Sequence, residues 1–459
     1  MEIAERVKNL LYKGIRLVGD PKRGLVSCLL NRQLFYVLLI TLLGVFLRLW
    51  WIIVIPNPPL SDFKTYYLLA TDIFNGNSLY NTKLGWQGMG YPVALGFYFR
   101  LVGNTGVFTA KVFNVILSTG TLILFFLILR KLTDKKNVIY TAYMILAVLP
   151  NYIAYNNVLG TEVFVTFILA VIIALQVYNI NHWLKYPLMG IFVGAAALTK
   201  PFFLAYPVVL ASVKWLKTKS VKETVVLFIT VFFFMAALVA PWTYRNYRKY
   251  GSFIPVSYNA GYVLYVNNND VNSWGGWMSV KEIPPSNEFK KEIEKRGYSY
   301  GDIKPELETL YKNRAKQWIK NNPQEYLKLG FLRFNNTFFS GAADIEKWTM
   351  VKLKLTNVSD IRFFKVFMRL CDLVVGVLSV FGIVYTLLQL KRILKGLFGK
   401  RIKIDYLVSI PSLNITFFSA VFFALEGQPR YNFPVLIFLV IYTALCINLI
   451  RGEQRSLTA

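Results

Sequence analysis

The sequence predicts an all-α polytopic membrane protein, and three observations support this fold class. Apolar residues make up 55% of the 459-residue chain and charged residues only 17%, whereas a typical soluble protein carries about 25% charged residues. Apolar runs of roughly 18 or more residues, the length that crosses a bilayer, recur along the chain. Basic residues gather in the short loops between these runs. We therefore expect one membrane domain of about ten transmembrane helices with one extramembrane insertion.

Residues 1–33 precede the first apolar run and form a basic leader. Several of its apolar residues fall close to one helical face, opposite most of the charges: Ile3, Val7, Leu10, Leu11 and Leu17. This pattern favours an amphipathic helix on the cytoplasmic membrane surface, with a partly disordered basic tail as the alternative. The apolar run that follows is too long for a signal peptide, so we interpret it as the first membrane helix.

The other apolar runs predict the remaining membrane helices. The expected spans are 34–55, 107–129, 137–151, 158–180, 184–199, 201–216, 222–242, 366–390, 404–425 and 433–450. Several of the middle segments are short for a complete span. Because proline ends or kinks a helix, Lys200-Pro201 is expected to separate two of them. The sequence does not fix the number of short helices between 137 and 216.

The loops between these spans indicate their orientation. Basic residues cluster in loops 130–136, 214–222 and 391–403, which fall on the side of the leader and of the tail 451–459 if there are ten spans. The positive-inside rule assigns that side to the cytoplasm. We therefore expect a multi-pass protein of the plasma membrane with both termini cytoplasmic. Because the net charge of +28 lies mainly in these regions, it indicates anionic lipid and not a nucleic-acid partner.

Two long loops are expected on the outer side. Loop 56–106 contains apolar-periodic stretches at 66–74 and 91–102, which predict short helices along the membrane. Region 243–365 is the most hydrophilic part of the chain and is expected to form a small extracytoplasmic domain. The membrane part then consists of a core, residues 34–242, and the C-terminal helices, residues 366–450.

Sulfur and imidazole ligands are scarce in this chain. Cys28, Cys371 and Cys446 are isolated from one another, and His182 is the only histidine. We therefore expect neither a disulfide framework nor a zinc site or proton relay built from histidines.

Charged residues inside membrane helices are costly and usually mark function. Here they gather near the outer helix ends and in the adjoining loops, while the inner halves of the same helices are almost uncharged. The set comprises Asp62, Lys111, Glu162, Lys200, Arg245, Arg369, Asp372, Glu426 and Arg430. Any one of these residues could simply face lipid headgroups, but that alternative explains the asymmetry of the whole set less well.

Carboxylates beside cations at the depth of lipid headgroups suit chemistry on a phosphate-bearing lipid. The cations would hold a phosphate or diphosphate as leaving group, and arginine offers bidentate geometry for it. A carboxylate would accept the proton of an attacking hydroxyl. The phosphate departs as a stable anion and needs no acid. This constellation would suit glycosyl transfer from a polyprenyl phosphate.

Short motifs in the outer regions point to a family. They are Ser61-Asp62 with Tyr66 and Ala70; Gly90-Tyr91-Pro92; Gly160-Thr161-Glu162; Pro241–Asn246 followed by Gly251, Gly261-Tyr262 and Asn267–Asn269; and Glu426 with Pro429-Arg430-Tyr431 and Pro434. Together they resemble the GT-C superfamily of membrane glycosyltransferases, specifically the bacterial relatives of protein O-mannosyltransferases and the aminoarabinose transferase. The resemblance extends over most of the chain, from about residue 34 to 450.

Combining the charges with this resemblance, we expect an inverting glycosyltransferase with an extracytoplasmic active site. Asp62 would be the general base and Glu162 the second carboxylate of a catalytic pair. The donor phosphate would be bound by Lys111, Lys200, Arg245 and Arg430. Substrates would be oriented by Tyr66, Tyr91, Asn246, Glu426 and Tyr431. The donor would be a polyprenyl-phosphate-linked hexose or pentose, the acceptor a glycan, lipid or protein, and Glu162 with Glu426 could also help to hold a divalent cation.

The sequence also departs from the family pattern. Phe63 follows Asp62 where the family often has glutamate, and Gly85–Gly90 replaces the Glu-Lys-Pro-Pro element of the aminoarabinose branch. These departures argue against aminoarabinose as the sugar and lipid A as the acceptor. Trp274 and Trp277 could stack on a sugar, although aromatic residues beside a membrane usually serve as anchors.

The sequence also allows other interpretations. A transporter or lipid flippase for a phosphate-bearing lipid would need paired broken helices and polar residues near the bilayer midplane, and neither is evident. A membrane scaffold without chemistry would not need the outer carboxylates. Asp62 itself has a simple alternative role, because Ser61-Asp62 ahead of an apolar-periodic stretch is also typical of a helix N-cap.

Overall fold

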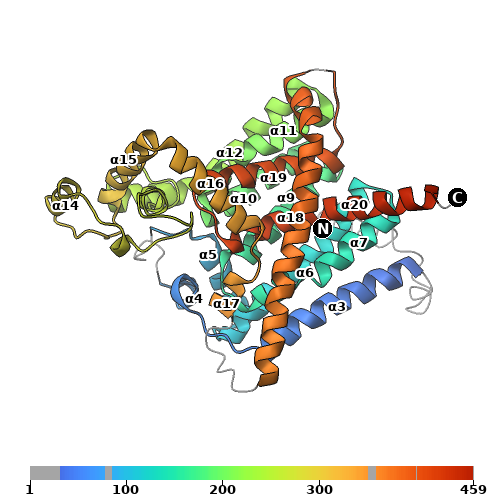
Figure 1. Ribbon diagram of the computed structural model, residues 1–459, viewed down its shortest axis with the longest axis horizontal. Helices are drawn as coiled ribbons and strands as arrows, with labels where there is room; N and C mark the ends of the chain where they lie inside the picture. Colours follow the sequence, from blue (N-terminus) through green and yellow to red (C-terminus); the bar gives the residue numbers. More distant parts are fainter. Residues whose placement is uncertain (1–31, 78–84, 350–357, 400, 458–459) are drawn as a thin grey trace, which may run out of the picture.

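The computed structural model describes residues 32–77, 85–349, 358–399 and 401–457 (Figure 1). In these residues the regular elements are all helices, so the predicted all-α class is confirmed. The amphipathic helix expected in the leader lies almost wholly outside the described residues.

Each of the predicted membrane spans contains a helix. Six helices are long and apolar enough to cross a membrane: α3 (Arg32–Val54), α6 (Val107–Leu132), α12 (Val221–Tyr250), α18 (Val358–Phe398), α19 (Tyr406–Ala424) and α20 (Phe433–Leu457). Their apolar composition and number make the protein a multi-pass membrane protein.

The other predicted spans are shorter or broken. Helix α7 (Lys136–Ala147) bends by 43° into α8 (Pro150–Ala154) and η1 (Tyr155–Asn157), and this pair counts as a possible seventh span. The rest of the core consists of α9 (Thr161–Val177), α10 (His182–Thr199), η2 (Pro201–Ala205) and α11 (Tyr206–Thr218). The break expected at Lys200-Pro201 is present, because η2 begins at the proline. By length and composition the described residues therefore contain six or seven complete spans.

The basic loops meet at one end of the helical bundle, which we call the basic end. The Nζ atom of Lys131 lies 5.0 Å from the centre of the Tyr178 ring, and Lys217 forms an ion pair of 2.6 Å with Asp405. The amide of Ile404 donates a hydrogen bond of 2.9 Å to the carbonyl of Leu216. These contacts bring the connections α6–α7, α9–α10, α11–α12 and α18–α19 to the same end.

The opposite end of the bundle gathers the loops that contain the predicted site residues, and we call it the site end. Helices α10 and α12 run parallel, since Gly190 packs against Val231 and Gly194 against Met235. Their C-terminal ends therefore lie on the same side. Helices α4 (Ser61–Phe74) and α5 (Gly90–Val102) connect α3 to α6 at this end, packed on each other.

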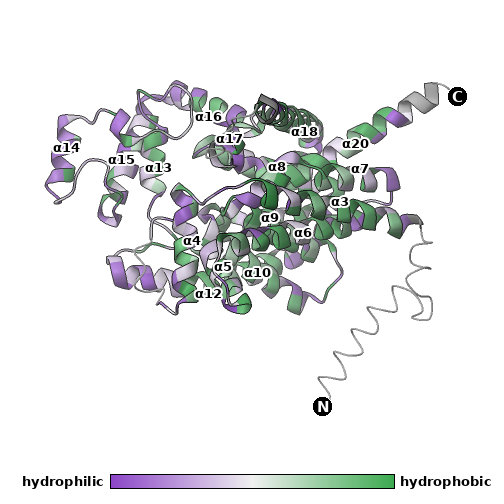
Figure 2. Ribbon diagram, turned by 90° about the horizontal axis from the view of Figure 1, so that it is seen from below, coloured by the Kyte–Doolittle hydropathy of each residue, from purple (hydrophilic) through white to green (hydrophobic). Residues whose placement is uncertain are grey.

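A hydrophilic region extends beyond the site end. Helices α13 (Ala260–Asn267), α14 (Asn287–Glu294) and α15 (Pro305–Asn321) and the turn η3 (Val280–Glu282) share a small apolar core of their own. Figure 1 shows α14 and α15 to one side of the bundle, and Figure 2 shows that their residues are largely hydrophilic, in contrast to those of the membrane helices. Inside this region Glu308 accepts a hydrogen bond from the amide of Gly261 at 2.6 Å, and burial raises the pKa of its carboxyl group.

Two further helices join this region to the bundle. Helix α16 (Pro323–Phe338) packs along α19, with the hydroxyl of Tyr326 donating to the carbonyl of Ala424 at 3.1 Å. Helix α17 (Ala343–Thr349) follows and contacts α8, α18 and the turn η4 (Pro429–Asn432). The sequence between α12 and α18 therefore builds part of the site end itself.

Candidate active site

Three charged residues from distant parts of the chain meet at the site end. Glu162 lies in the first turn of α9, Lys200 follows the last residue of α10, and Arg430 lies in η4. The Oε1 atom of Glu162 is 3.4 Å from Nζ of Lys200 and 3.8 Å from Nε of Arg430. The Glu162 side chain is only 4% exposed and that of Arg430 10%. A buried carboxylate with two cations is therefore the centre of the site, as burial of a charge requires partners of opposite sign.

Aromatic rings enclose the guanidinium group of Arg430. Its Cζ atom lies 5.5 Å from the ring centre of Phe63, 5.6 Å from Trp348 and 5.7 Å from Tyr431. Cations at this distance from aromatic rings are stabilised by the ring quadrupole. The backbone amide of Arg430 donates a hydrogen bond of 2.8 Å to Asp344, which also accepts one of 2.9 Å from the Trp348 indole. Helix α17 thus fixes both the backbone and the side chain of Arg430.

Several buried polar atoms in this cluster have unused hydrogen-bonding capacity. The Oε2 atom of Glu162, the Nε atom of Arg430 and the hydroxyl of Tyr155 are buried and form no hydrogen bond with the described residues. The charges of Glu162 and Arg430 both act on the Tyr155 hydroxyl, so the three groups are neighbours. Buried polar groups are usually paired, and this site therefore has both donors and acceptors to offer a polar ligand.

Glu426 reaches the cluster through Tyr431. The hydroxyl of Tyr431 donates a hydrogen bond of 3.0 Å to Glu426, and the amide of Gln428 donates to the other carboxylate oxygen. The ring of Tyr431 lies 4.9 Å from Nζ of Lys200. The predicted pair of Glu426 and Tyr431 is therefore next to the cations, but Glu426 does not contact them directly.

Asp62 lies in the first turn of α4 and is partly exposed. Leu60 is the N-cap residue of this helix and provides no side-chain cap, while Ser61 adopts a left-handed backbone conformation with φ of 48°. The capping role suggested by the sequence is therefore wrong. Such a conformation is costly for a residue other than glycine and is often found at functional sites.

Tyr66 connects Asp62 to the cluster. Burial is the main cause that raises the pKa of its hydroxyl, and the charges of Asp62 and Glu162 raise it further. Arg430 lowers the pKa of the same group. Asp62, Glu162 and Arg430 therefore all lie near Tyr66, whose hydroxyl keeps its proton.

The loop that leads into Glu162 is fixed by buried amide side chains. Asn114, fully buried in α6, donates a hydrogen bond of 2.8 Å to the carbonyl of Val158. The same side chain accepts a hydrogen bond of 3.1 Å from the hydroxyl of Tyr91. The carbonyl of Asn157 accepts a further hydrogen bond of 3.1 Å from Asn57. Tyr91 is thus placed to support the Glu162 loop and not to face a substrate.

The remaining predicted residues lie in separate positions at this end. Arg245 stacks on the ring of Trp242 at 4.5 Å and donates a hydrogen bond of 2.9 Å to Asn246. The amide of Asn246 donates to the carbonyls of Ile254 and Val256 and so fixes the turn after α12. Lys111 is buried in α6 and forms no ion pair within the described part of the chain.

Asp372 has a supporting role. Its carboxylate accepts hydrogen bonds of 2.7 Å each from the backbone amides of Gly341 and Ala342, just before α17. In the same turn, the carbonyl oxygen of Gly341 accepts a hydrogen bond of 2.9 Å from the side-chain amide of Asn151. Arg369 lies one turn earlier on α18 and is exposed. Asp372 therefore anchors the helix that contains Asp344 and Trp348.

Sequence reasoning missed Asp344, Trp348 and Tyr155. Asp344 is 86 positions from Arg430 in the chain, and it lies in a stretch without a recognisable motif. Its only signal was its location in an outer region that also contains other charges. The two aromatic residues carry no charge and so had no signal of their own.

The site does not fit a divalent cation. Within the described ranges no group of three or more His, Cys, Asp or Glu side chains is placed to hold a metal ion. Glu162 already faces the two cations Lys200 and Arg430, which would repel a divalent cation placed there. The expectation that Glu162 and Glu426 share a metal ion is therefore not supported by their arrangement.

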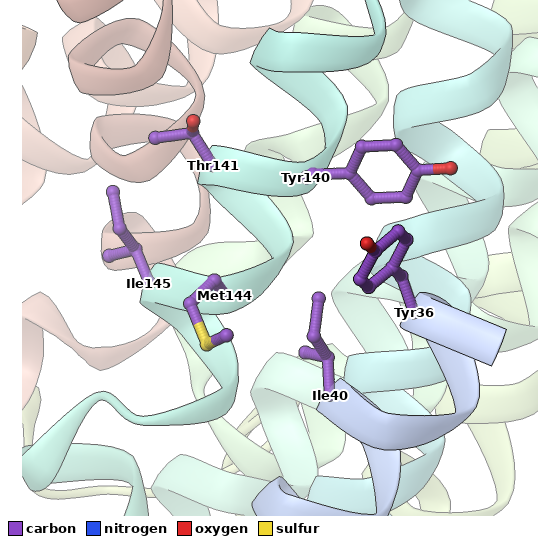
Figure 3. A pocket seen from close by; sticks show the side chains of 6 residues that line it. All are labelled: Tyr36, Ile40, Tyr140, Thr141, Met144 and Ile145. Atoms are coloured by element: carbon purple, nitrogen blue, oxygen red, sulfur yellow. The ribbon is translucent and has the colours of Figure 1, made fainter. Parts of the chain in front are cut away.

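A groove elsewhere on the bundle is unrelated to this cluster. It lies between α3 and α7, has a volume of about 430 Å³ and is lined by Tyr36, Ile40, Tyr140, Thr141, Met144 and Ile145 (Figure 3). Tyr36 and Tyr140 lie near the starts of their helices, at the basic end. Its apolar lining suits lipid contact, and it contains none of the predicted site residues.

Comparisons with known proteins find similar solved structures, among them two of archaeal proteins. No protein-family model and no curated protein matches the sequence. One similar structure is an oligosaccharyltransferase of Archaeoglobus fulgidus tethered to an acceptor peptide containing the NVT sequon, with 13% identity and a TM-score of 0.48 over 93% of this chain and 50% of that chain. The other is AglB from the same organism with an inhibitory peptide and a dolichol-phosphate, with 13% identity and a TM-score of 0.48 over 94% of this chain and 52% of that one.

This chain spans about half the length of these archaeal proteins.

Proposed function

We propose that this protein is a glycosyltransferase that moves a sugar from a polyprenyl-phosphate-linked donor to an acceptor at the outer face of the plasma membrane. The observation that carries this proposal is the buried cluster of Glu162, Lys200 and Arg430 with the partly exposed Asp62 close by. A cationic centre and a separate carboxylate are the two parts that such a transfer needs.

Lys200 and Arg430 are the candidates for the donor phosphate. Lys200 and Arg430 share one ion-pair partner, Glu162, so an anionic ligand at this position would contact two cations. The Nε atom of Arg430 forms no hydrogen bond with the described residues and so adds a donor for a charge-assisted hydrogen bond, which is stronger than a neutral one. Burial strengthens the interaction further, since the surroundings screen it less than water does. Arg245 and Lys111, at the same end of the bundle, are further candidates for binding the donor phosphate.

Asp62 is the candidate base. Its carboxylate forms no ion pair with the residues that the structure describes, so it is freer to accept a proton than Glu162. In the transfer, Asp62 takes the proton of an acceptor hydroxyl, whose oxygen attacks the anomeric carbon. The bond from that carbon to the phosphate oxygen breaks, and the phosphate leaves with the electron pair beside Lys200 and Arg430. A single displacement of this kind inverts the anomeric centre.

The orientation follows from the charge distribution. The basic end suits the cytoplasmic side, because basic loops are retained there. The site end then faces outward, where α4, α16 and α17 pack around the cluster. The acceptor would be a glycan, lipid or protein of the cell envelope, and the sugar a hexose or pentose.

The test is binding of undecaprenyl phosphate to the purified protein in lipid nanodiscs, with undecaprenol as the uncharged reference. We expect the phosphate to bind more tightly than the alcohol. Arg430→Ala should weaken phosphate binding by about 1.5–3 kcal/mol, roughly 10- to 150-fold. Arg430→Lys should restore only part of the affinity, because lysine lacks the planar fork of arginine.

Arg100→Ala is the matched control, because Arg100 is an exposed arginine at the end of α5. Thermal unfolding of each variant separates lost binding from lost folding. Equal affinity of the wild-type protein for the phosphate and the alcohol would contradict the proposed phosphate site. Tight binding without any sugar transfer in native membranes would instead favour a lipid flippase.

A further inference from the structure

Trp274 belongs to the hydrophilic region, and one face of its indole ring is exposed. The residue lies between α13 and η3, and its side chain is 50% exposed. The six-membered ring lies against the backbone of Gly276, where a Cβ atom would come within 1.9 Å of the ring carbon Cζ3. Only glycine leaves room for the ring there. One side of the ring is therefore covered by backbone and the other is open.

The backbone that carries this ring is held by a network of side chains. Asn272 accepts hydrogen bonds from the amides of Trp274 (3.3 Å) and Gly275 (2.9 Å) and donates one of 3.0 Å to the carbonyl of Gly276. Asn336 of α16 donates a hydrogen bond of 2.9 Å to the carbonyl of Trp274. Gly275 adopts a positive φ of 78°, which favours glycine. The orientation of the exposed ring is thus fixed before any ligand binds.

The same network reaches the candidate active site through Arg333. This fully buried arginine donates a hydrogen bond of 3.1 Å to the carbonyl of Gly275 and one of 3.2 Å to that of Phe423, at the end of α19. Gly427 packs on the backbone of Arg333. A Cβ atom added to Gly427 would lie only 2.4 Å from the carbonyl oxygen of Arg333. Gly427 adjoins Glu426, which accepts the hydrogen bond of Tyr431. One residue therefore connects the Trp274 loop to the loop that holds Arg430.

We propose that Trp274 is a stacking platform for a sugar ring of the donor or the acceptor. A pyranose presents a face of C–H groups that packs on an aromatic ring, while its hydroxyl groups need hydrogen-bonding partners at the rim. Asn336, partly exposed beside Trp274, donates through its amide nitrogen to the Trp274 carbonyl and keeps its amide oxygen as an acceptor for such a hydroxyl group. Trp277, 37% exposed, lies 5.9 Å from the ring centre of Tyr262 and is a second exposed tryptophan in the same loop.

A membrane anchor would look different. Interfacial tryptophans act by partitioning into the headgroup layer and need no fixed ring orientation. Trp183, at the start of α10 near the basic end, fits that description, since its side chain is 79% exposed. Trp274 combines half exposure with hydrogen bonds that fix its backbone on both sides. This difference favours recognition of a ligand over anchoring.

The first test asks what Trp274 faces and does not depend on the proposed function. The protein is labelled with 5-fluorotryptophan in nanodiscs, and the Trp274 ¹⁹F resonance is assigned as the one that Trp274→Phe removes. A water-soluble gadolinium chelate should broaden this resonance, and a nitroxide-labelled lipid should broaden that of Trp183. Broadening of the Trp274 resonance by the lipid nitroxide alone would show a membrane anchor and overturn the proposal.

The second test measures sugar transfer and rests on the proposed function. In membranes of the native host, with endogenous radiolabelled polyprenyl-phosphate sugars, Trp274→Ala should raise KM for the donor or the acceptor roughly 10-fold. Gly276→Ala should have a similar effect although the indole remains, because the added methyl group displaces the ring. Trp274→Phe should retain most of the activity, and Trp183→Ala should leave KM unchanged.

The substrate whose KM rises identifies the source of the sugar, donor or acceptor. Unchanged KM for both substrates in Trp274→Ala would overturn the platform while leaving the glycosyltransferase intact. Loss of transfer in Glu162→Gln is the reference for the active site. If neither wild type nor any variant transfers sugar, the proposed function fails, and the ¹⁹F measurement still decides whether Trp274 faces water.

Discussion

At the scale of single residues, the two carboxylates expected to act together have different surroundings. Glu162 is buried between Lys200 and Arg430, whereas Asp62 is partly exposed and lies at the start of α4. A carboxylate between two cations keeps its negative charge and is a poor proton acceptor. Asp62 is therefore the better candidate base, and Glu162 the better candidate for holding the two cations in place.

Asp62→Asn is expected to abolish turnover without affecting the fold. Asparagine has nearly the same shape but cannot accept a proton, and Asp62 makes no capping hydrogen bond whose loss would unfold α4. We expect turnover to fall at least about 100-fold, the low end for general bases, with unchanged binding of undecaprenyl phosphate. Sugar transfer and thermal unfolding of the same preparation are the measurements.

Asp72→Asn provides the matched control, since Asp72 is a second aspartate on α4 outside the cluster. It should transfer sugar at the wild-type rate. Wild-type turnover in Asp62→Asn would mean that another group is the base, although the phosphate site could still stand.

The sequence indicated Glu162, Lys200 and Arg430 because charges next to membrane helices are rare enough to stand out. It did not indicate Asp344 or Trp348, which hold Arg430 from 86 and 82 positions away in the chain. Every residue except proline has a backbone N–H group, so the distribution of charged residues does not predict which amide Asp344 accepts from. Such partners become visible only when α17 is seen packed against η4.

At the scale of the elements, the end of α10 depends on a close approach of the loop before α5. Gly88 lies against the last turn of α10, where a Cβ atom would come within 2.3 Å of the Thr199 carbonyl oxygen and 2.6 Å of that of Leu198. Lys200 is the next residue. Because glycine has no side chain, the glycines of segment 85–90 allow this loop to pack against the end of α10 and so support Lys200.

Gly88→Ala should therefore weaken both stability and ligand binding. The methyl group has only backbone atoms to displace, and overpacking of this kind costs typically about 1–3 kcal/mol. We expect a lower midpoint of thermal unfolding and weaker binding of undecaprenyl phosphate, because the end of α10 must shift. Gly376→Ala is the control, since a Cβ atom there meets nothing within 4 Å and α18 should tolerate alanine. Wild-type behaviour of Gly88→Ala would show that the loop can move without affecting Lys200.

Element boundaries followed the sequence where proline or a change in composition marked them. The break at Lys200-Pro201 is such a case. The bend between α7 and α8, which precedes Pro150, was absorbed into a single expected span of 137–151. Short apolar helices such as α9 and α11 have no sequence signal that separates a complete span from a shorter buried helix, because both are apolar on all sides.

At the scale of the whole molecule, the separation of a basic end from the site end predicts the orientation in the membrane. We expect loop 130–136 in the cytoplasm and α14 outside. In a variant without native cysteines, a membrane-impermeant maleimide added to intact cells should label Lys291→Cys in α14 but not Lys135→Cys. Both positions are exposed, so accessibility of the side chain does not decide the result. Labelling of Lys135→Cys alone would invert the topology and place the candidate site on the cytoplasmic side.

The sequence by itself determined the all-α class, the positions of the apolar helices and the end of the bundle at which the basic loops gather. These features follow from local composition, because each helix must be apolar along its own length to lie in lipid. Tertiary structure decided which charges meet. It brought Glu162, Lys200 and Arg430 together and added Asp344, and it tied the Trp274 loop to α19 through Arg333. Contacts between segments far apart in the chain depend on how the helices pack. The composition of each segment does not specify which other helix it packs against.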